Sequence, residues 1–172
     1  MVSQVHYSSG KDNWGTPPRL FEQAQCIWDF ELDVCAEPWS AKCESFYTKR
    51  DNGLLLRWKS WSWCNPPYSQ IEAWLEKAAL ERHHGASSVM LIPSRTDTKA
   101  FHRYAPQASR IFLVKGRLRF IDPETEKERD YAPFPSMLIE FDSKYTGTKP
   151  SVEFMSLTNS NPNQPTLLEA LA

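Results

Sequence analysis

Residues 60–72 read Ser60-Trp61-Ser62-Trp63-Cys64-Asn65-Pro66-Pro67-Tyr68-Ser69-Gln70-Ile71-Glu72. The aromatic run over 60–64 predicts a short buried strand, and the Ser-x-x-Glu pattern over 69–72 is typical of a capping box that opens a helix. Residues 65–68 therefore lie on a turn from a strand into a helix. Open α/β sheets place their ligands at such turns, outside the carboxyl ends of the strands. The stretch predicts an α/β sheet with a functional site at 65–68.

The turn itself is rich in hydrogen-bond acceptors. Pro66 and Pro67 have no N–H group, so this segment offers carbonyl oxygens without competing donors. The side-chain oxygen of Asn65 adds an acceptor, so the site can hold both hydrogens of one amino group. Tyr68 supplies a flat ring on which a base can stack. The alternative is a plain proline turn, but the rarity of this tetrapeptide favours the functional interpretation.

The composition is that of one globular domain. The chain has 172 residues, 41% of them apolar and 24% charged, which is enough to bury a core unaided. A net charge of −1 argues against coating nucleic acid by bulk electrostatics but leaves room for a local basic patch. No apolar run reaches membrane-spanning length, and the first residues are no signal peptide. We therefore expect a cytoplasmic protein with no membrane partner.

Cysteine usage gives no sign of a metal site. The chain has four cysteines, with no C-x-x-C pair and no histidine at zinc spacing. We expect them to be reduced and to act as small core residues, with Cys35 and Cys64 at the ends of strands. We therefore expect the chain to bind no metal.

Hydrophobic periodicity predicts helices that alternate with strands. We expect one helix to start at Pro17, capped by Thr16, and others over 70–84, ended by Gly85, and about 97–104. Expected strands cover 28–35, 60–64, 88–93, 110–114, 117–121 and 137–141. An exposed charged loop or hairpin is expected over 122–131, and flexible ends over 1–13 and 158–172. One domain, 14–157, is thus expected to form an α/β sheet with an antiparallel edge.

The chain resembles the small phage-encoded DNA N-6-adenine methyltransferases. Asn65-Pro66-Pro67-Tyr68, with Ser69, is the most specific part, and the resemblance covers about residues 14–142. Further matches are Trp14-Gly15-Thr16-Pro17, Leu32-Asp33-Val34-Cys35-Ala36 and Asp51-Asn52-Gly53-Leu54, and they continue to Phe120. The resemblance implies that 14–157 is a Rossmann-like methyltransferase domain, mostly parallel, with helices on both faces. It also implies S-adenosylmethionine as cofactor, duplex DNA as partner and a bacterial host cytoplasm as location.

The resemblance assigns catalytic roles to Asn65, Pro66, Pro67 and Tyr68. In the family, the Asn side chain and the first Pro carbonyl bind the target amino group, while the Tyr stacks on the flipped base. The residues implied to contact the cofactor are Trp14, Thr16, Pro17, Asp33, Cys35, Ala36, Asp51 and Gly53.

Each cofactor assignment has a structural alternative. Asp33 is expected to hold the cofactor's ammonium directly or through water, or else to cap the turn after its strand. Thr16-Pro17 also fits a plain helix start, and Asp51 with Gly53 also fits an ordinary turn. One departure from related methyltransferases stands out: no glycine lies between Gly15 and Gly53. The usual glycine-rich turn is thus missing, with Ala36 and Pro38 in its place.

Basic residues suggest contacts with DNA phosphates. Lys115, Arg117 and Arg119 alternate with other residues, so on a strand they would share one face. Such a face suits phosphate contacts, which position a protein on DNA without reading sequence, although an ordinary solvated face is equally consistent. Arg95 and Lys99 follow the strand that ends at Pro93, on the side of the catalytic turn, and are expected to meet the DNA backbone.

The resemblance, together with the acceptor-rich turn at 65–68, implies transfer of a methyl group from S-adenosylmethionine to N6 of an adenine flipped out of duplex DNA. Two alternatives stay open. The motif also fits enzymes that act on another amine: cytosine N4, RNA adenine or protein glutamine. The missing glycine turn also fits a non-catalytic protein that binds DNA or interacts with the host on the same fold.

Overall fold

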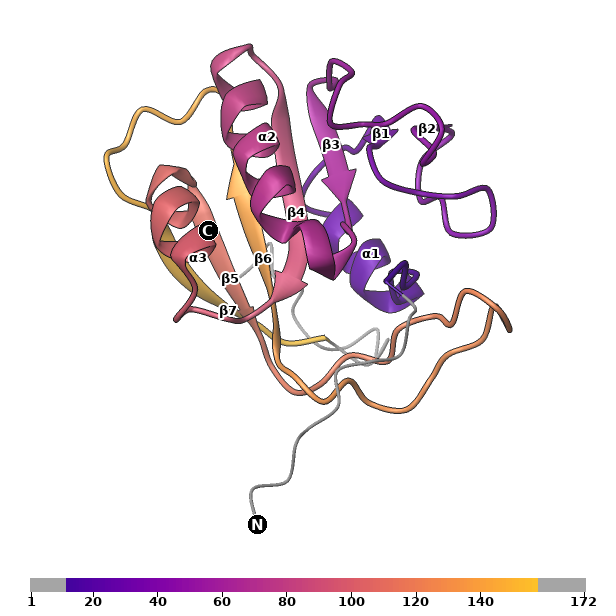
Figure 1. Ribbon diagram of the computed structural model, residues 1–172. Helices are drawn as coiled ribbons and strands as arrows, with labels where there is room; N and C mark the ends of the chain where they lie inside the picture. Colours follow the sequence, from indigo (N-terminus) through magenta and orange to yellow (C-terminus); the bar gives the residue numbers. More distant parts are fainter. Residues whose placement is uncertain (1–11, 158–172) are drawn as a thin grey trace.

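A seven-stranded sheet forms the middle layer of the computed structural model, which describes residues 12–157 (Figure 1). Its strands in chain order are β1 Leu32–Asp33, β2 Ser45–Phe46, β3 Trp61–Cys64, β4 Ser87–Pro93, β5 Arg110–Val114, β6 Ser136–Phe141 and β7 Ser151–Met155. The helices are α1 Pro18–Gln25, α2 Ile71–His83 and α3 Lys99–Tyr104, with 3-10 turns η1 Tyr68–Gln70 and η2 Ala105–Gln107. None of the helices described has the length and apolar character that crossing a bilayer requires.

The sheet is mostly parallel, in the order β2-β1-β3-β4-β6-β5-β7. Strands β2, β1, β3 and β4 pair in parallel, and β7 pairs in parallel with β5. The antiparallel strand is β6, which is flanked on both sides by β4 and β5 and is not outermost. Because β1, β3, β4 and β5 all run in one direction, their carboxyl ends lie at one edge of the sheet.

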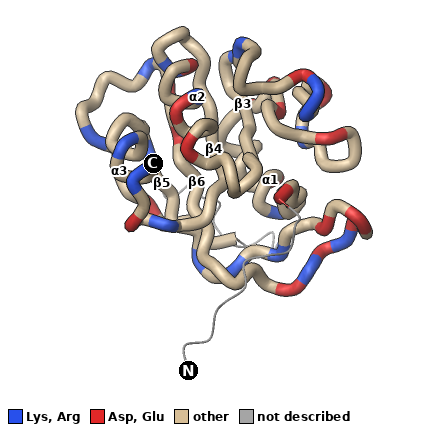
Figure 2. The backbone as a smooth tube through the Cα atoms, viewed as in Figure 1, with Lys and Arg blue, Asp and Glu red and all other residues tan. Residues whose placement is uncertain are grey.

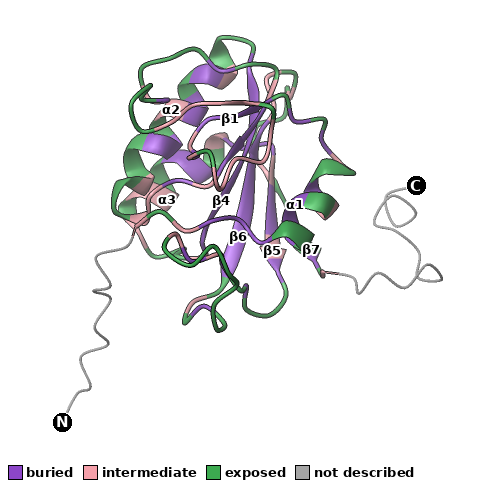
Figure 3. Cartoon of the chain, turned by 90° about the vertical axis from the view of Figure 1, so that its right-hand side faces the viewer, coloured by how far each residue is buried: buried purple, intermediate pink, exposed green. Residues whose placement is uncertain are grey.

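Helices cover both faces of the sheet, as expected. Figure 3 shows α2 and α3 on one side of the buried sheet and α1 on the other. Strand β4 alternates between the two cores: Met90 and Ile92 pack with the α2 side, and Val89 and Leu91 with the α1 side. All seven of its residues are buried, which explains the continuous apolar run of a strand that is covered on both faces.

Two predicted helix starts are wrong. Helix α1 begins at Pro18 after Pro17, and no side chain among the described residues caps it; the Thr16 hydroxyl instead accepts a hydrogen bond from the Trp63 indole. The capping box at 69–72 does not form either, because Ser69 lies inside η1 and its hydroxyl binds Asp12. Helix α2 ends at His83, and the predicted stop, Gly85, follows it with a φ of +90°, which suits glycine.

Two predicted strands differ from the structure. The strand expected over 28–35 is reduced to Leu32–Asp33. Its first part is a turn, in which the Ile27 and Trp28 N–H groups donate to the Ala24 carbonyl at the end of α1. The strand expected over 117–121 does not form: Gly116 has a φ of +83° and breaks the extended backbone, and Ile121 makes only isolated bridges. Strand β7 was not predicted, since most of its residues are exposed.

The segment between β5 and β6 is a long loop rich in charge. Figure 2 shows Lys and Arg interspersed with Asp and Glu along it. Residues 124–131 are exposed, which confirms the exposed charged loop. The expected flexible ends lie outside the described residues, apart from Asp12 and Asn13, which the structure does describe.

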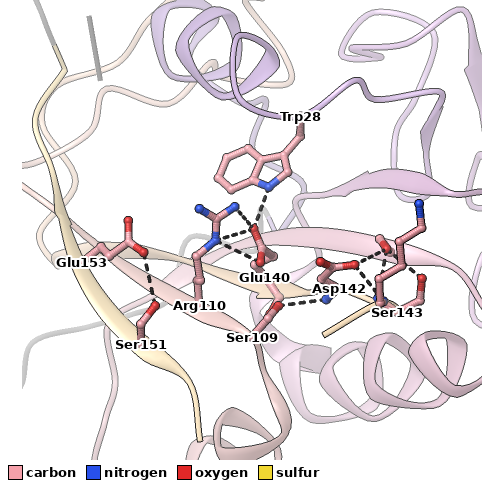
Figure 4. Close-up of polar contacts among 10 residues, drawn as sticks. Trp28, Ser109, Arg110, Glu140, Asp142, Ser143, Ser151 and Glu153 are labelled. Atoms are coloured by element: carbon pink, nitrogen blue, oxygen red, sulfur yellow. Dashed lines mark hydrogen bonds and ion pairs between the residues drawn. The ribbon is translucent and has the colours of Figure 1, made fainter. Parts of the chain in front are cut away.

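A buried carboxylate ties β6 to its neighbours. Glu140 is 2% exposed and lies opposite Arg110 of β5. The Arg110 guanidinium donates to both oxygens, at 2.6 to 3.1 Å. The Trp28 indole N–H donates to the same carboxylate at 2.7 Å, as Figure 4 shows. A carboxylate is tolerated in the core because these donors replace its lost hydration.

We predict that Glu140→Ala lowers the free energy of unfolding by about 3 kcal/mol, because it leaves a half-buried guanidinium and a buried indole N–H without the carboxylate that accepts from both. Urea denaturation measures the change. Glu128→Ala is the matched control: this residue pairs with Arg119 at 3.1 Å, with both side chains over 40% exposed, so its removal should change stability by less than about 1 kcal/mol. Equal losses in the two variants would contradict the prediction.

Candidate functional site

A cavity of about 310 Å³ lies at the carboxyl edge of β1 and β3. Its wall is built from four segments: residues 12–14, the loop after β1, the turn after β2, and the β3–α2 turn with the start of α2. The volume is in the range of sites for small ligands and cofactors. The place is the one where open α/β sheets bind ligands.

The structure brings many of the predicted site residues to this cavity. Among the described residues, those that were predicted and do line it are Trp14, Cys35, Ala36, Gly53, Asn65 and Pro67. Those that were predicted and do not line it are Thr16, Pro17, Asp33, Asp51, Pro66 and Tyr68. The sequence interpretation also missed lining residues, notably Asp12, Glu37, Asn52 and Trp74. Trp74 lies within the helix that was expected over 70–84, and Asp12 within the flexible end that was expected over 1–13.

Asn65 directly follows the last residue of β3. One end of its side-chain amide, the NH₂ group, already makes a hydrogen bond. The Nδ2 group donates to the Trp14 carbonyl at 2.5 Å. The Oδ1 atom is shielded from solvent and accepts no hydrogen bond from any described residue. A buried acceptor without a donor costs about 1–3 kcal/mol. An incoming N–H group that reached Oδ1 would remove that cost.

Tyr68 lies beside the cavity within an aromatic cluster. Its ring packs edge-on against Phe134 and Phe120, with centroids 5.5 Å and 6.1 Å away. Burial raises the pKa of its hydroxyl, and the charge of Asp12 adds to this effect. The hydroxyl has no partner among residues 12–157. Since Phe120 and Phe134 lie at the two ends of the β5–β6 loop, that loop is packed directly against the motif.

Asp33 organises the loop that forms one wall of the cavity. It is 2% exposed, and its two oxygens accept from the backbone N–H groups of Cys35 and Lys42, at 3.2 and 3.1 Å. Burial raises its pKa to about 7, although both backbone hydrogen bonds and the Lys42 charge act in the opposite direction. These contacts match the alternative interpretation, in which Asp33 caps the turn after its strand.

The turn after β2 is also defined by local contacts. The Asp51 carboxylate accepts from the N–H and the hydroxyl of Thr48, at 2.8 and 2.7 Å, which fits the ordinary-turn alternative for this residue. Asn52 has a φ of 58° and lines the cavity. Gly53 is required by close packing: a Cβ there would lie 2.2 Å from the Val34 carbonyl oxygen. The glycine therefore lets this turn pack against the loop after β1.

The basic residues predicted to meet DNA do not share a strand face. Lys115 and Arg117 are exposed in the loop after β5, whereas Arg119 pairs with Glu128 and donates to the Arg129 carbonyl. The predicted strand does not form because the backbone turns at Gly116, but the alternation of exposure persists: all three cations are exposed, whereas Leu118 and Phe120 are buried. Arg95 and Lys99 are exposed beyond the carboxyl end of β4. Because β4 and β5 run in one direction, all five lie on segments that leave the cavity edge of the sheet.

All four cysteines are free, as expected, but only Cys64 is fully buried. Burial raises the pKa of the Cys64 and Cys35 thiols, which keeps them protonated and unsuited to act as nucleophiles.

Comparisons with known proteins agree on one family. The profile of the family described as DNA N-6-adenine-methyltransferase (Dam) matches residues 3–168. The chain is 33% identical over 141 residues to the DNA N-6-adenine-methyltransferase of Haemophilus phage HP1 (strain HP1c1), covering 79% of this chain and 82% of that protein. It is 28% identical over 138 residues to the DNA N-6-adenine-methyltransferase of Escherichia phage T1, covering 70% and 58% of the two proteins. A shorter match, 34% over 65 residues, is to the putative methyltransferase YfdM of Escherichia coli (strain K12), covering 33% and 71%.

We predict that Asp33 makes stability depend on pH. Its pKa is raised from 3.8 to about 7, so the folded state holds this proton more tightly than the unfolded state does. The contribution of Asp33 to the free energy of unfolding is therefore greatest below pH 3.8, and it falls as the pH rises towards about 7. Urea denaturation of wild type and Asp33→Asn across this range measures it. The wild-type advantage should shrink with rising pH, and a constant difference would show that Asp33 is ionised throughout.

Proposed function

Because the chain belongs to the DNA N-6-adenine-methyltransferase family and is an adenine-specific DNA methyltransferase, we propose that Asn65, Pro66 and Tyr68 form its catalytic centre. Methyltransferases of this kind generally use S-adenosylmethionine, and the cavity beside Asn65 is the proposed cofactor site. The family assignment favours adenine N6 of DNA over the other amines that the motif alone left open. It likewise disfavours a non-catalytic role.

The observation that carries the proposal is the unpaired Asn65 Oδ1 atom. This oxygen and the Pro66 carbonyl would accept the two hydrogens of adenine N6, and no proline N–H competes for the amine. That arrangement turns the nitrogen lone pair away from the two acceptors. It also stabilises the positive charge that develops on N6 during methylation, because both dipoles point their negative ends at it. The shielding of Oδ1 from solvent strengthens this interaction.

The cavity residues fit the cofactor. S-adenosylmethionine supplies, when bound, an electrophilic methyl group on a sulfonium sulfur. Ala36 and Gly53 leave room along the wall, since neither carries a long side chain. Glu37 also lines the cavity, and its carboxylate suits a cationic ammonium group. Asp33 would act indirectly, by holding the N–H groups of Cys35 and Lys42 and so the shape of the loop.

Thr16, Pro17 and Asp51 are proposed to support the cofactor site from behind the cavity wall. The Thr16 hydroxyl accepts from the buried Trp63 indole at 3.1 Å, which ties the start of α1 to the strand that carries Asn65. Asp51 holds the β2 turn through Thr48. In both cases the contact fixes a segment whose neighbours, Trp14 and Gly53, do line the cavity.

Base flipping completes the proposed mechanism. Adenine N6 cannot meet the methyl group inside the stacked duplex, so the base has to leave the helix. Tyr68 would stack on the flipped base, and its neighbours Phe120 and Phe134 would keep the ring in place. Duplex DNA would lie along the cavity edge, where Arg95, Lys99, Lys115 and Arg117 would meet phosphates. Arg119 would join them only if it exchanged Glu128 for a phosphate.

We predict that Asn65→Ala lowers turnover by about 10²-fold or more, the scale for loss of one preorganised polar group at a reacting centre. The assay transfers labelled methyl groups to duplex DNA and identifies the methylated nucleoside. Cofactor affinity, measured by calorimetry, should change little because Asn65 is assigned to the amine. A folded variant with near-normal turnover would remove Asn65 from the mechanism and with it the proposed function of this site.

Substitution of Tyr68 separates the ring from the hydroxyl. Tyr68→Ala should weaken capture of the flipped base by about 1–3 kcal/mol, the worth of one base–aromatic stack. Tyr68→Phe should be nearly silent, because the hydroxyl makes no hydrogen bond to any described residue. Fluorescence of 2-aminopurine at the target position reports the flipped state. If Phe were as damaging as Ala, the hydroxyl would be functional and stacking would not explain the role of Tyr68.

A further inference from the structure

Residues 12–15, here called the strap, cross the catalytic turn and are tied down at both ends. At one end, the Asp12 carboxylate accepts from the backbone N–H of Ser69 at 3.2 Å and also from the Ser69 hydroxyl. At the other end, Gly15 and Ile121 exchange two backbone hydrogen bonds of 2.9 Å. Gly15 is required there, because a Cβ would lie 2.9 Å from both Ile121 and Trp39.

Between these ties, the strap places one carbonyl against the Asn65 amide. The Trp14 carbonyl lies 2.5 Å from Asn65 Nδ2. A carbonyl can only accept a hydrogen bond, so it must face the NH₂ group of the amide and not the oxygen. The Trp14 carbonyl therefore decides which way the amide points, and it leaves Oδ1 as the atom without a partner.

This orientation matters for the reaction. An asparagine amide has a donor end and an acceptor end of nearly the same shape, and only the acceptor end can bind an amino group. With the amide reversed, NH₂ would face the adenine amine, donor against donor. An aspartate would need no such control, because both of its oxygens accept.

We propose that Asp12 is a positioning residue for methyl transfer: it clamps the strap to Ser69 and thereby keeps the Trp14 carbonyl against Asn65, with Oδ1 turned to the substrate. The inference rests on the proposed role of Asn65. It gives a function to a residue that the sequence pattern had placed in a flexible end. It also gives Ser69, directly after the motif, a role as the anchor of the clamp.

The test measures Asp12→Ala in two backgrounds. In the wild-type background, a loosened strap lets the Asn65 amide reverse, so kcat should fall by about three- to tenfold, the worth of roughly one ordinary hydrogen bond. In the Asn65→Asp background, the strap presses a carbonyl oxygen against a carboxylate oxygen. Loosening it relieves this repulsion, so Asp12→Ala should raise kcat above that of Asn65→Asp alone. A loss of stability alone would lower kcat in both backgrounds. The Ser69→Ala variant keeps the Asp12 charge and so separates the strap from simple relief of repulsion between two carboxylates.

Two further variants make the test specific. Ser69→Ala removes the hydroxyl on the other side of the clamp and should show the same reversal of sign, in weaker form. Asp29→Ala removes an exposed carboxylate after α1 and should change kcat in neither background. Thermal unfolding of every variant shows whether the fold is retained.

A second readout needs no activity. The Asn65 side-chain NH₂ protons, assigned in the ¹⁵N–¹H spectrum by their loss in Asn65→Ala, should exchange with solvent faster in Asp12→Ala than in wild type. Unchanged exchange, or a fall in kcat by the same factor in both backgrounds, would overturn the role of Asp12 while leaving the proposed function intact. A fully active Asn65→Ala would overturn both.

Discussion

The parallel pairing of β1 with β3 is the constraint on which the site depends. Leu32 lies opposite Ser62 and Asp33 opposite Trp63, so the loop after β1 and the turn at Asn65 leave the sheet side by side. Both strands are short, with two and four residues, so their own hydrogen bonds contribute little. The Trp63 ring is fully buried and packs edge-on against Phe21 and Phe30, at 5.3 and 5.4 Å. Aromatic packing therefore holds β3 in register, and β3 holds Asn65 at the cavity.

The missing glycine-rich turn is replaced by two separate devices. A glycine turn lets the backbone approach a cofactor closely and leaves N–H groups free to bind it. Here the buried Asp33 carboxylate takes up two N–H groups and gives the loop its shape. The close approach occurs elsewhere, at Gly53 against the Val34 carbonyl. The glycine that close packing requires is therefore not in the loop after β1 but at Gly53, in the turn that packs against that loop.

Unpaired polar atoms are concentrated at the site. Among the described residues, five buried side-chain atoms lack a hydrogen-bond partner, and three of them belong to Asn65, Tyr68 and Trp74. The other two are the Ser88 and Ser136 hydroxyls. The buried carboxylates, by contrast, are satisfied: Glu140 accepts from Arg110 and Trp28, and Glu81 from Lys77 and the Trp58 backbone. Binding sites commonly contain such unpaired atoms. A ligand that supplies the missing hydrogen-bond partner recovers the free energy that the folded protein lost by burying them.

Local pattern alone was sufficient for the α/β class, the strand-to-helix turn at 65–68 and the charged loop. The motif at 65–68, the continuous apolar run at 88–93 and the period of α2 each depend on neighbours along the chain, and each was predicted. The contact of Asp33 with the Lys42 N–H was not, and neither were the contacts of Asp12 and Arg119, because each depends on a residue that the fold brings near. Asp33 accepts from the Lys42 N–H, nine residues away, and Asp12 accepts from Ser69, 57 residues away. Arg119 pairs with Glu128 in a loop, because the backbone turns at Gly116 and no strand forms there. Sequence spacing identifies candidate residues for the chemistry, whereas tertiary packing decides which of their polar atoms already have hydrogen-bond partners.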